Sequence, residues 1–248
     1  MSCSVDSLYL DPERYDLIYG EYADIPRWFY QSIPEKGDLL ELACGTGRWL
    51  IPIAEQGIEV WGIDNSSPML DQCRVKAEKA GVDIPLFPDD MRAFHLNNEF
   101  SVIILVSNTV WHLLSRDDAV QCFMCVREHM KPDSLFMIGV FVPDPEILSR
   151  DPYTRYPYGD YTDPRTGRRV HITHTAVYDE DTQIRQLKCF EGDSSEVIAE
   201  LNLRMYFPEE LDELLEQSGF IIENKYGSWD RDSFHSDSGL QLIFCRTD

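Results

Sequence analysis

The sequence predicts an α/β fold in which a mainly parallel sheet carries helices on both faces. From residue 38 to residue 142, buried apolar runs alternate with turn-rich loops and amphipathic helical segments, the pattern of such sheets. The first apolar run ends in a glycine-rich turn, Gly45-Thr46-Gly47, and the second ends in the carboxylate of Asp64. A strand, a glycine turn, a helix, a second strand and then an acid are typical of a nucleotide-binding site.

The first part of the chain can be divided into elements in order. We expect strands to end near residues 43, 63, 87, 106 and 142, and a helix to cover residues 49 to 56. A second helix begins at Ser67-Pro68 and ends at Gly81, because a capping serine, an early proline and a closing glycine mark helix boundaries. A third helix begins after Ser115 in a segment like a capping box and stops at Met130-Lys131-Pro132.

The pattern changes after residue 142. Prolines and tyrosines between Pro143 and Pro164 predict a loop, and the segments 170–178, 184–190 and 197–206 predict an antiparallel sheet laid over the main one. After this insertion the alternation of helices and buried strands resumes, with a helix from Pro208 to Gly219 and strands over 220–226 and 240–245. We therefore expect one domain over residues 1–248, with an N-terminal lid over 1–36 and an antiparallel β insertion over about 143–206.

Composition excludes several classes of function. The 248 residues include 44 acids and 22 bases, for a net charge of −22, so the surface repels nucleic acids. The chain contains neither a long apolar run nor a basic start followed by an apolar stretch, which predicts a soluble, cytoplasmic protein without a membrane partner. The seven cysteines are scattered rather than arranged as a disulfide framework, which agrees with a reducing compartment.

Two cysteine sites in the sequence are candidates for a chemical role, as a metal or redox motif and as a nucleophile. Cys122-x-x-Cys125 has the spacing of a metal or redox motif, but no second pair accompanies it and apolar residues surround it at helical spacing. We expect it to pack in the core and expect no metal. Cys44 lies inside the glycine turn, where no neighbouring base would activate it as a nucleophile.

Two cofactors compete for such a turn, a dinucleotide and S-adenosylmethionine. A dinucleotide site requires a third glycine where the helix crosses the sheet, and Leu50 stands there instead. After the third strand, Asp90 can accept a hydrogen bond from an adenine amino group while Met91 packs on the ring. Asp64 can accept hydrogen bonds from both hydroxyls of a ribose. These residues favour S-adenosylmethionine over a nicotinamide cofactor.

Further segments along nearly the whole chain follow a shared pattern. They are Tyr15-Asp16-Leu17-Ile18-Tyr19, Glu41 to Gly47, Gly62 to Leu70, Asp90 to Phe94, Asn108 to Leu113, Met130 to Asp133, Phe207 to Leu211 and Glu216 to Phe220. In these segments the chain resembles the class I S-adenosylmethionine-dependent methyltransferases. The resemblance is to the small-molecule branch, which includes sugar-amine N,N-dimethyltransferases and glycine N-methyltransferases.

The resemblance implies a Rossmann-like mixed sheet of about seven strands whose last strand is antiparallel, S-adenosylmethionine as the cofactor, and a small-molecule methyl acceptor. Cofactor-binding roles carry over to Tyr15, Tyr19, Glu41, Ala43, Gly45, Gly47, Asp64, Asn65, Met69, Asp90, Met91 and Ser107. The chain departs from the family at Ala43, where many members have glycine, and at Asp133-Ser134, where a Gly-Gly turn is usual.

Methyl transfer from a sulfonium is an in-line displacement, so the protein contributes mainly alignment and the exclusion of water. His112 follows the fourth strand at the sheet edge where ligands bind, which makes it the candidate base, although a histidine packing at a helix start explains it equally well. Tyr153, Tyr156, His171 and His174 are candidates for binding the acceptor. His171 and His174 have opposite parity on one strand, so at most one faces the cavity.

The residues leave N-methylation and O-methylation both open, along with the identity of the acceptor and the oligomeric state. Two other classes of function also remain: a cofactor-binding or cyclase-type protein that transfers no methyl group, and, as the weaker alternative, a nicotinamide-dependent oxidoreductase.

Overall fold

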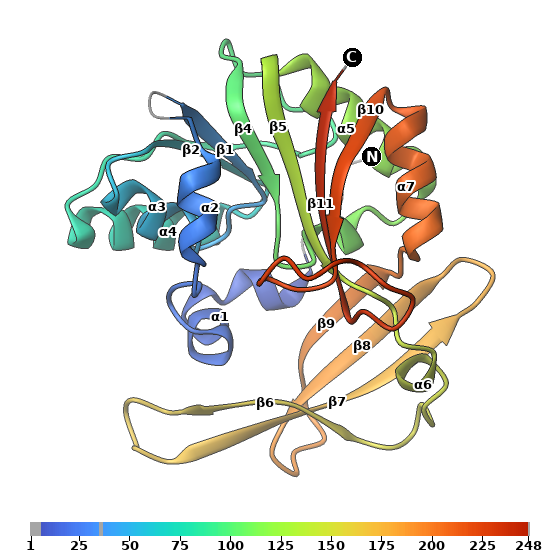
Figure 1. Cartoon of the computed structure of the whole chain (residues 1–248). Helices are drawn as coiled ribbons and strands as arrows, with labels where there is room; N and C mark the ends of the chain where they lie inside the picture. The colour runs from blue at the N-terminus through green and yellow to red at the C-terminus, as the bar shows by residue number, and fades with distance from the viewer. Residues whose placement is uncertain (1–5, 35–36, 248) are drawn as a thin grey trace.

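The computed structural model describes residues 6–34 and 37–247, and a seven-stranded mixed sheet forms its centre (Figure 1). The strand order is β10-β11-β5-β4-β1-β2-β3. The bounds are β1 Asp38–Leu42, β2 Glu59–Asp64, β3 Leu86–Pro88, β4 Phe100–Leu105, β5 Met130–Phe141, β10 Phe220–Tyr226 and β11 Leu240–Thr247. The last strand, β11, runs antiparallel to both β5 and β10, which confirms the predicted mixed sheet.

Helices cover both faces of this sheet. Alternate residues of β1 point to opposite sides, so Leu39 packs with α2 (Arg27–Ser32), α3 (Leu50–Glu55) and α4 (Ser67–Ala80), while Leu40 packs on the other side. That other side carries α5 (Arg116–Glu128) and α7 (Pro208–Gln217). Burial of both faces accounts for the nearly continuous apolar strands in the sequence. Within the described ranges, no helix is long and apolar enough to cross a bilayer.

A second sheet of four antiparallel strands lies beyond the lower ends of the main strands in Figure 1. It consists, in order, of β6 (Tyr156–Thr162), β7 (Arg169–Asp179), β8 (Ile184–Glu191) and β9 (Val197–Arg204). The loop predicted from Pro143 to Pro164 is therefore wrong, because it contains β6 and the short helix α6 (Pro145–Leu148). An edge strand tolerates proline, and the pairing of β6 with β7 shifts register between Pro157 and Gly159.

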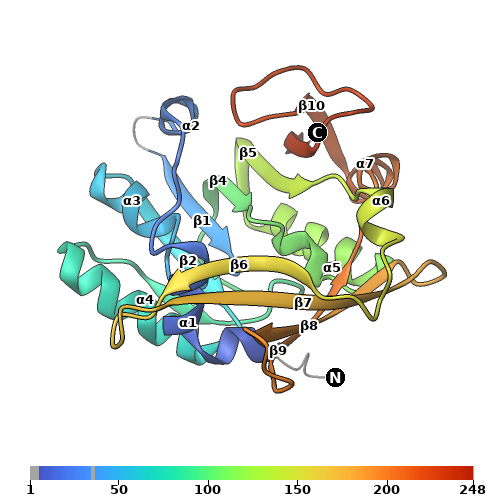
Figure 2. The same ribbon diagram turned by 90° about the horizontal axis from the view of Figure 1, so that it is seen from below.

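The N-terminal segment packs between the two sheets. It forms the short helices η1 (Ser7–Leu10) and α1 (Pro12–Tyr19), whose Leu8, Tyr15 and Ile18 share an apolar cluster with the four-stranded sheet. Viewed from below, β6 and β7 cross the molecule with α1 beside them (Figure 2). Of the lid predicted over residues 1–36, residues 1–5 and 35–36 lie outside the described part of the chain.

Several local predictions can be compared with the structure. The cap of α4 is Ser66, one residue before the predicted serine, and Gly81 ends the helix in the left-handed region with φ +70°. Ser115 caps α5 by accepting a hydrogen bond from the Asp118 amide, as predicted. Asp133, at the position of a usual glycine, has φ +61° and keeps the left-handed turn, which aspartate tolerates better than most residues.

The predicted core packing of Cys122 and Cys125 is confirmed, because both side chains are buried against the main sheet. The Cys125 thiol donates a hydrogen bond to the Phe94 carbonyl oxygen. Cys44 is also buried, and burial raises the pKa of its thiol well above the ordinary value. A protonated, buried thiol is a poor nucleophile.

Candidate functional site

The glycine turn follows β1 and brings main-chain groups to the edge of the main sheet. Gly45 and Gly47 have φ angles of +55° and +79°, in the region where residues with a Cβ are strained. A Cβ on Gly47 would also lie 2.5 Å from the sulfur of Cys73, so this position requires glycine. Ala43 has φ +50° despite its Cβ, which places strain at the site.

Asp64, at the end of β2, is tied to the glycine turn. Its Oδ2 accepts a hydrogen bond from the Gly45 amide at 2.8 Å, and its Oδ1 accepts one from the Ser66 amide at 2.7 Å. Burial raises the pKa of this carboxyl. Each carboxylate oxygen can accept about two hydrogen bonds, so both retain capacity for the hydroxyls of a ligand.

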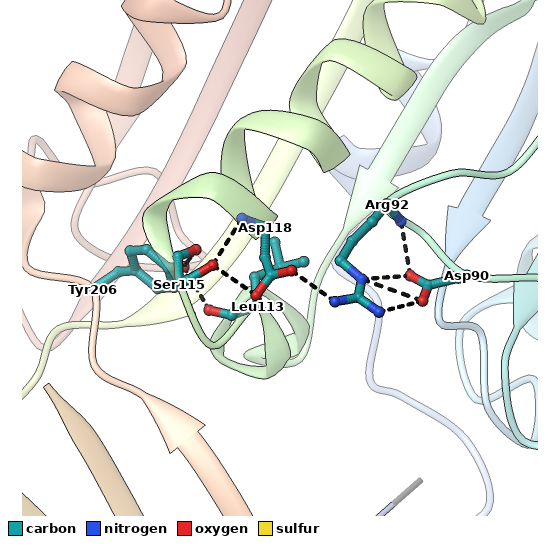
Figure 3. A network of polar contacts seen from close by, with 6 residues as sticks. All are labelled: Asp90, Arg92, Leu113, Ser115, Asp118 and Tyr206. Atoms are coloured by element: carbon teal, nitrogen blue, oxygen red, sulfur yellow. Dashed lines mark hydrogen bonds and ion pairs between the residues drawn. The ribbon is translucent and has the colours of Figure 1, made fainter. Parts of the chain in front are cut away.

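An arginine holds the carboxylate that follows β3. Figure 3 shows Arg92 between Asp90 and Asp118. The donor–acceptor distances are 2.6 Å from Nη2 to Oδ2 of Asp90 and 2.6 Å from Nη1 to Oδ1 of Asp118. The hydrogen bonds from Arg92 lower the pKa of Asp90. They also occupy much of its accepting capacity, so Asp90 is fixed as an anion beside Asp89 and Met91 at this end of the cavity.

Glu41 is a buried carboxyl group without an internal partner for one of its oxygens. Among the described residues, Oε2 has no hydrogen-bond partner. Burial and the neighbouring charge of Asp64 raise its pKa well above the ordinary value. A cationic group on a ligand would relieve both effects.

These groups converge on one cavity at the carboxyl edge of β1, β2 and β4. The residues that line it include ten of those predicted to bind the cofactor, namely Tyr15, Glu41, Ala43, Gly45, Asp64, Asn65, Met69, Asp90, Met91 and Ser107. Of the remaining two, Tyr19 lines a neighbouring cavity and Gly47 lies behind the turn against Cys73. The geometry therefore brings most of the predicted cofactor residues together.

The neighbouring cavity has a volume of about 730 Å³, within the range usual for small-molecule sites. Its walls come from the N-terminal segment, the main-sheet edge, the four-stranded sheet and the loop between β10 and β11, which contributes Trp229. The residues that line both cavities are Tyr9, Tyr15, Arg48, Trp49, Ser107 and His112. The two cavities therefore meet at a shared wall, as required for a reaction between two ligands.

His112 is held at this wall by two partners that the sequence did not identify. Its Nε2 lies 2.9 Å from the hydroxyl oxygen of Tyr9, and its Nδ1 lies 3.5 Å from Oδ2 of Asp6. With the proton assigned to Nδ1, facing the carboxylate, Nε2 accepts a hydrogen bond from Tyr9. The Tyr9 oxygen then keeps a lone pair for a proton from a bound molecule.

The structure also locates the four residues predicted to bind the acceptor. Tyr153, Tyr156, His171 and His174 do not line either cavity in the described structure. Tyr153 is 91% exposed, and the exposed His171 pairs with Asp160. His174 is buried and receives a hydrogen bond from Arg185, so the two histidines do differ in exposure as their parity implies. Their role in acceptor binding stays a prediction.

Sequence reasoning missed the residues contributed by the N-terminal segment and by β8. Asp6 and Tyr9 precede the recognisable Tyr15-to-Tyr19 pattern and have no motif of their own. Arg185 could have been noticed, because it shares the strand parity of the buried Leu187 and Cys189. An arginine on the buried face of a strand is unusual unless a partner or a ligand needs it.

The sequence comparisons agree with the geometry. Residues 39–133 match a family described as "Methyltransferase domain". YqeM of Bacillus subtilis, which is named as a methyltransferase, is 27% identical over 215 residues, covering 82% of this chain and 81% of that protein. A dTDP-3-amino-3,4,6-trideoxy-alpha-D-glucopyranose N,N-dimethyltransferase of Streptomyces venezuelae is 27% identical over 132 residues, covering 50% of this chain and 54% of its own.

Solved structures share the fold over most of the chain. The CcbJ methyltransferase from Streptomyces caelestis has a TM-score of 0.79 at 23% identity and covers 96% of this chain and 97% of its own. The glycopeptide N-methyltransferase MtfA in complex with S-adenosylmethionine has a TM-score of 0.61 at 21% identity, covering 89% and 91%. At these identities the likeness establishes the architecture, which confirms the predicted Rossmann-like sheet.

Proposed function

We propose that this chain, whose residues 39–133 match the methyltransferase domain family, transfers the methyl group of S-adenosylmethionine to an amine of a small molecule. The observation that carries the proposal is the meeting of two cavities at Tyr9, Trp49 and His112. One cavity contains the polar groups that an adenosyl cofactor needs, and the other is large enough for a small acceptor.

The residues of the first cavity fit the cofactor. The unpaired oxygen of Glu41 suits the ammonium of the methionine part, Asp64 suits the ribose hydroxyls, and Met91 suits the adenine ring. When bound, S-adenosylmethionine supplies an electrophilic methyl group on a good leaving group. The protein's contribution is to align the acceptor and to exclude water.

An amine is the acceptor that the relatives favour. The Streptomyces venezuelae relative is named as an N,N-dimethyltransferase and MtfA as an N-methyltransferase. An attacking amine must be neutral, and the chain from Tyr9 through His112 to Asp6 offers a path for its proton. In this proposal the Tyr9 oxygen takes the proton and passes its own to His112.

The proposal also assigns roles to the chain's parts. We treat the chain as one methyltransferase domain in which the N-terminal segment forms a lid and the residues from about 143 to 206 roof the acceptor cavity. Tyr19 and Tyr158 support this, because their hydroxyls are hydrogen-bonded to each other across α1 and β6. Closed aromatic contacts of this kind exclude water from a transfer site.

Two measurements test the proposal. Calorimetry should show binding of S-adenosylmethionine and S-adenosylhomocysteine at least tenfold tighter than binding of NAD. Incubation with methyl-labelled S-adenosylmethionine and a panel of small amines should label at least one amine, whereas their hydroxyl analogues should remain unlabelled. Comparable affinity for NAD would overturn the cofactor assignment, and label on the hydroxyl analogues alone would replace N-methylation with O-methylation.

A further inference from the structure

Arg185 stands out because it is a cation in the cavity wall without a carboxylate partner. It lies on β8 and lines the acceptor cavity beside Leu187, Leu203 and Tyr158. Its Nη2 donates a hydrogen bond to Nε2 of His174 at 3.1 Å. Within the part of the chain that the structure describes, no Asp or Glu forms an ion pair with it.

The electrostatic surroundings of Arg185 leave its charge unbalanced. Burial lowers the pKa of the guanidinium, and the like charge of Arg150 acts in the same direction. Burial and Arg185 itself lower the pKa of His174 to about 4, so this histidine is neutral at pH 7 and serves as an acceptor. A partly buried charge without a counter-ion is costly, which makes Arg185 exceptional in a chain with a net charge of −22.

Other arginines in the structure show the contrast. Arg92 pairs with Asp90 and Asp118, and Arg204 pairs with Glu210. The two carboxylates that line the acceptor cavity, Asp24 and Asp144, are both exposed. The acidic groups of the cavity therefore lie toward solvent, while the unpaired cation lies against apolar side chains of the four-stranded sheet.

Arg48, the other arginine in the wall of this cavity, donates its hydrogen bonds to backbone carbonyl oxygens. Arg48 donates to the carbonyl oxygens of Tyr19 and Gly20 at 2.6 and 2.8 Å and so ties the end of α1 to the glycine turn. Arg185 has only the neutral His174 as a partner in the described structure. A guanidinium presents five N–H donors, which leaves Arg185 able to bind a two-oxygen anion in the bidentate manner.

We propose that Arg185 binds an anionic oxygen group, a carboxylate or a phosphate, on the methyl acceptor. The assignment of this ligand as the acceptor rests on the proposed function. The substrate class is then a small molecule that carries both an amine and an acid group, with the acid directed toward β8. The apolar wall formed by Leu187 and Leu203 strengthens the ion pair by excluding water.

The test uses simple probes because it concerns the anion alone. The protein is saturated with S-adenosylhomocysteine and titrated with phenyl phosphate, phenylacetate, benzyl alcohol and benzylamine, and binding is followed by the fluorescence of the cavity tryptophans, Trp49, Trp111 and Trp229. We expect at least one of the two anions to bind tenfold or more tightly than the alcohol and the amine. The stronger of the anions distinguishes a phosphate site from a carboxylate site.

Three variants complete the test. Arg185→Gln should weaken binding of the preferred anion at least tenfold and leave the affinity for S-adenosylhomocysteine within twofold. Arg185→Lys, which retains the charge and guards against misfolding, should recover part of the anion affinity. Lys188→Gln is the matched control, because Lys188 is an exposed cation on the same strand, paired with Glu200 across the surface.

Two results would overturn the inference. One is equal binding of anions and neutral probes by the wild-type protein, and the other is unchanged anion binding by Arg185→Gln. Either result with intact S-adenosylhomocysteine binding rejects the anion site alone. Failure of the wild-type protein to bind S-adenosylhomocysteine would instead contradict the proposed function, so the two failures are distinguishable.

Discussion

Asp64 combines a structural and a binding role in one side chain. Its two oxygens accept hydrogen bonds from the amides of Gly45 and Ser66, and the residue lines the first cavity, which we assign to the cofactor. In Asp64→Asn, the amide oxygen can still accept one of these hydrogen bonds. The amide nitrogen is a donor, however, and it would face the other backbone N–H group, which is also a donor. We expect the affinity for S-adenosylhomocysteine to fall by about 2 kcal/mol, roughly thirtyfold.

Calorimetry measures this change, with Asp71→Asn as the control because Asp71 is an exposed residue of α4 that pairs only with Arg74 in the described structure. Circular dichroism establishes that each variant is folded. An unchanged affinity in folded Asp64→Asn would show that the carboxylate does not contact the cofactor.

Tyr9 is the residue that connects a bound acceptor to His112 in the proposed proton path. Tyr9→Phe removes the hydroxyl that lies 2.9 Å from Nε2 and interrupts the proposed proton path. We expect kcat for amine methylation to fall about tenfold or more, with the cofactor Kd unchanged. Steady-state kinetics across pH provide the measurement.

The control for this prediction is Tyr161→Phe, which removes a hydroxyl from β6 at a position outside both cavities. A loss of kcat equal in the two variants would point to a general effect on folding. If Tyr9→Phe kept full turnover while His112→Ala lost it, the proton path would begin at the histidine itself.

His174 should make the protein's stability depend on pH. Its pKa is lowered from 6.5 to about 4 in the folded protein, first by burial and then by Arg185. Between these values the unfolded chain binds a proton that the folded chain does not, so stability falls as the pH falls from about 6.5 toward 4. His174→Gln should lose less stability between pH 7 and pH 5 than the wild-type protein in urea unfolding. An equal loss would mean that another group carries the dependence.

At the scale of elements, a buried ion pair attaches the N-terminal helix to the main domain. Lys76 on α4 lies 3.0 Å from Asp16 on α1, and both are buried. Asp16 also accepts a hydrogen bond at 2.6 Å from the hydroxyl of Thr46 in the glycine turn. The aspartate between the two tyrosines of the N-terminal pattern therefore fixes α1 against the cofactor cavity.

Removal of one partner leaves the other charge buried and unpaired. We expect Lys76→Met to lower the free energy of unfolding by about 3 to 5 kcal/mol, and the double change Asp16→Asn with Lys76→Met to recover part of it. Chemical denaturation measures both, with Lys79→Met on the exposed face of α4 as the control. A cost for Lys76→Met no greater than for Lys79→Met would show that the pair contributes no net stability.

At the scale of the whole molecule, the cofactor cavity is assembled from distant parts of the chain. Tyr9 comes from the N-terminal segment, Gly45 from the turn after β1, Asp64 from the end of β2, and Asn202 from β9. A ligand that needs all of them binds only the folded protein. S-adenosylhomocysteine at 100 times its Kd should therefore stabilise the protein by about 2.7 kcal/mol.

For a chain of this length the stabilisation corresponds to a rise in Tm of roughly 5 to 11 °C, at about 2 to 4 °C for each kcal/mol. NAD at the same concentration should give a shift below about 1 °C, because weak binding adds little free energy. Differential scanning calorimetry measures both. Equal shifts for the two ligands would count against the cofactor assignment.

The sequence by itself determined the main sheet, its helices and most of the residues that line the proposed cofactor cavity. Those features depend on local signals: apolar strands, the glycines at 45 and 47, the caps at Ser115 and Gly81, and acids that directly follow strands. Because parallel strands end at the same edge of a sheet, residues placed after them meet without further information.

Only the tertiary structure decided what forms the proposed acceptor cavity. Strand β6 was mistaken for a loop because Pro157 is tolerated at a sheet edge, and an edge position is not visible in the sequence. The contact of Tyr9 with His112 spans 103 residues, and the isolation of Arg185 depends on which charges pack around it. Such contacts follow from long-range packing of the N-terminal segment and the second sheet, for which short segments of sequence contain no signal.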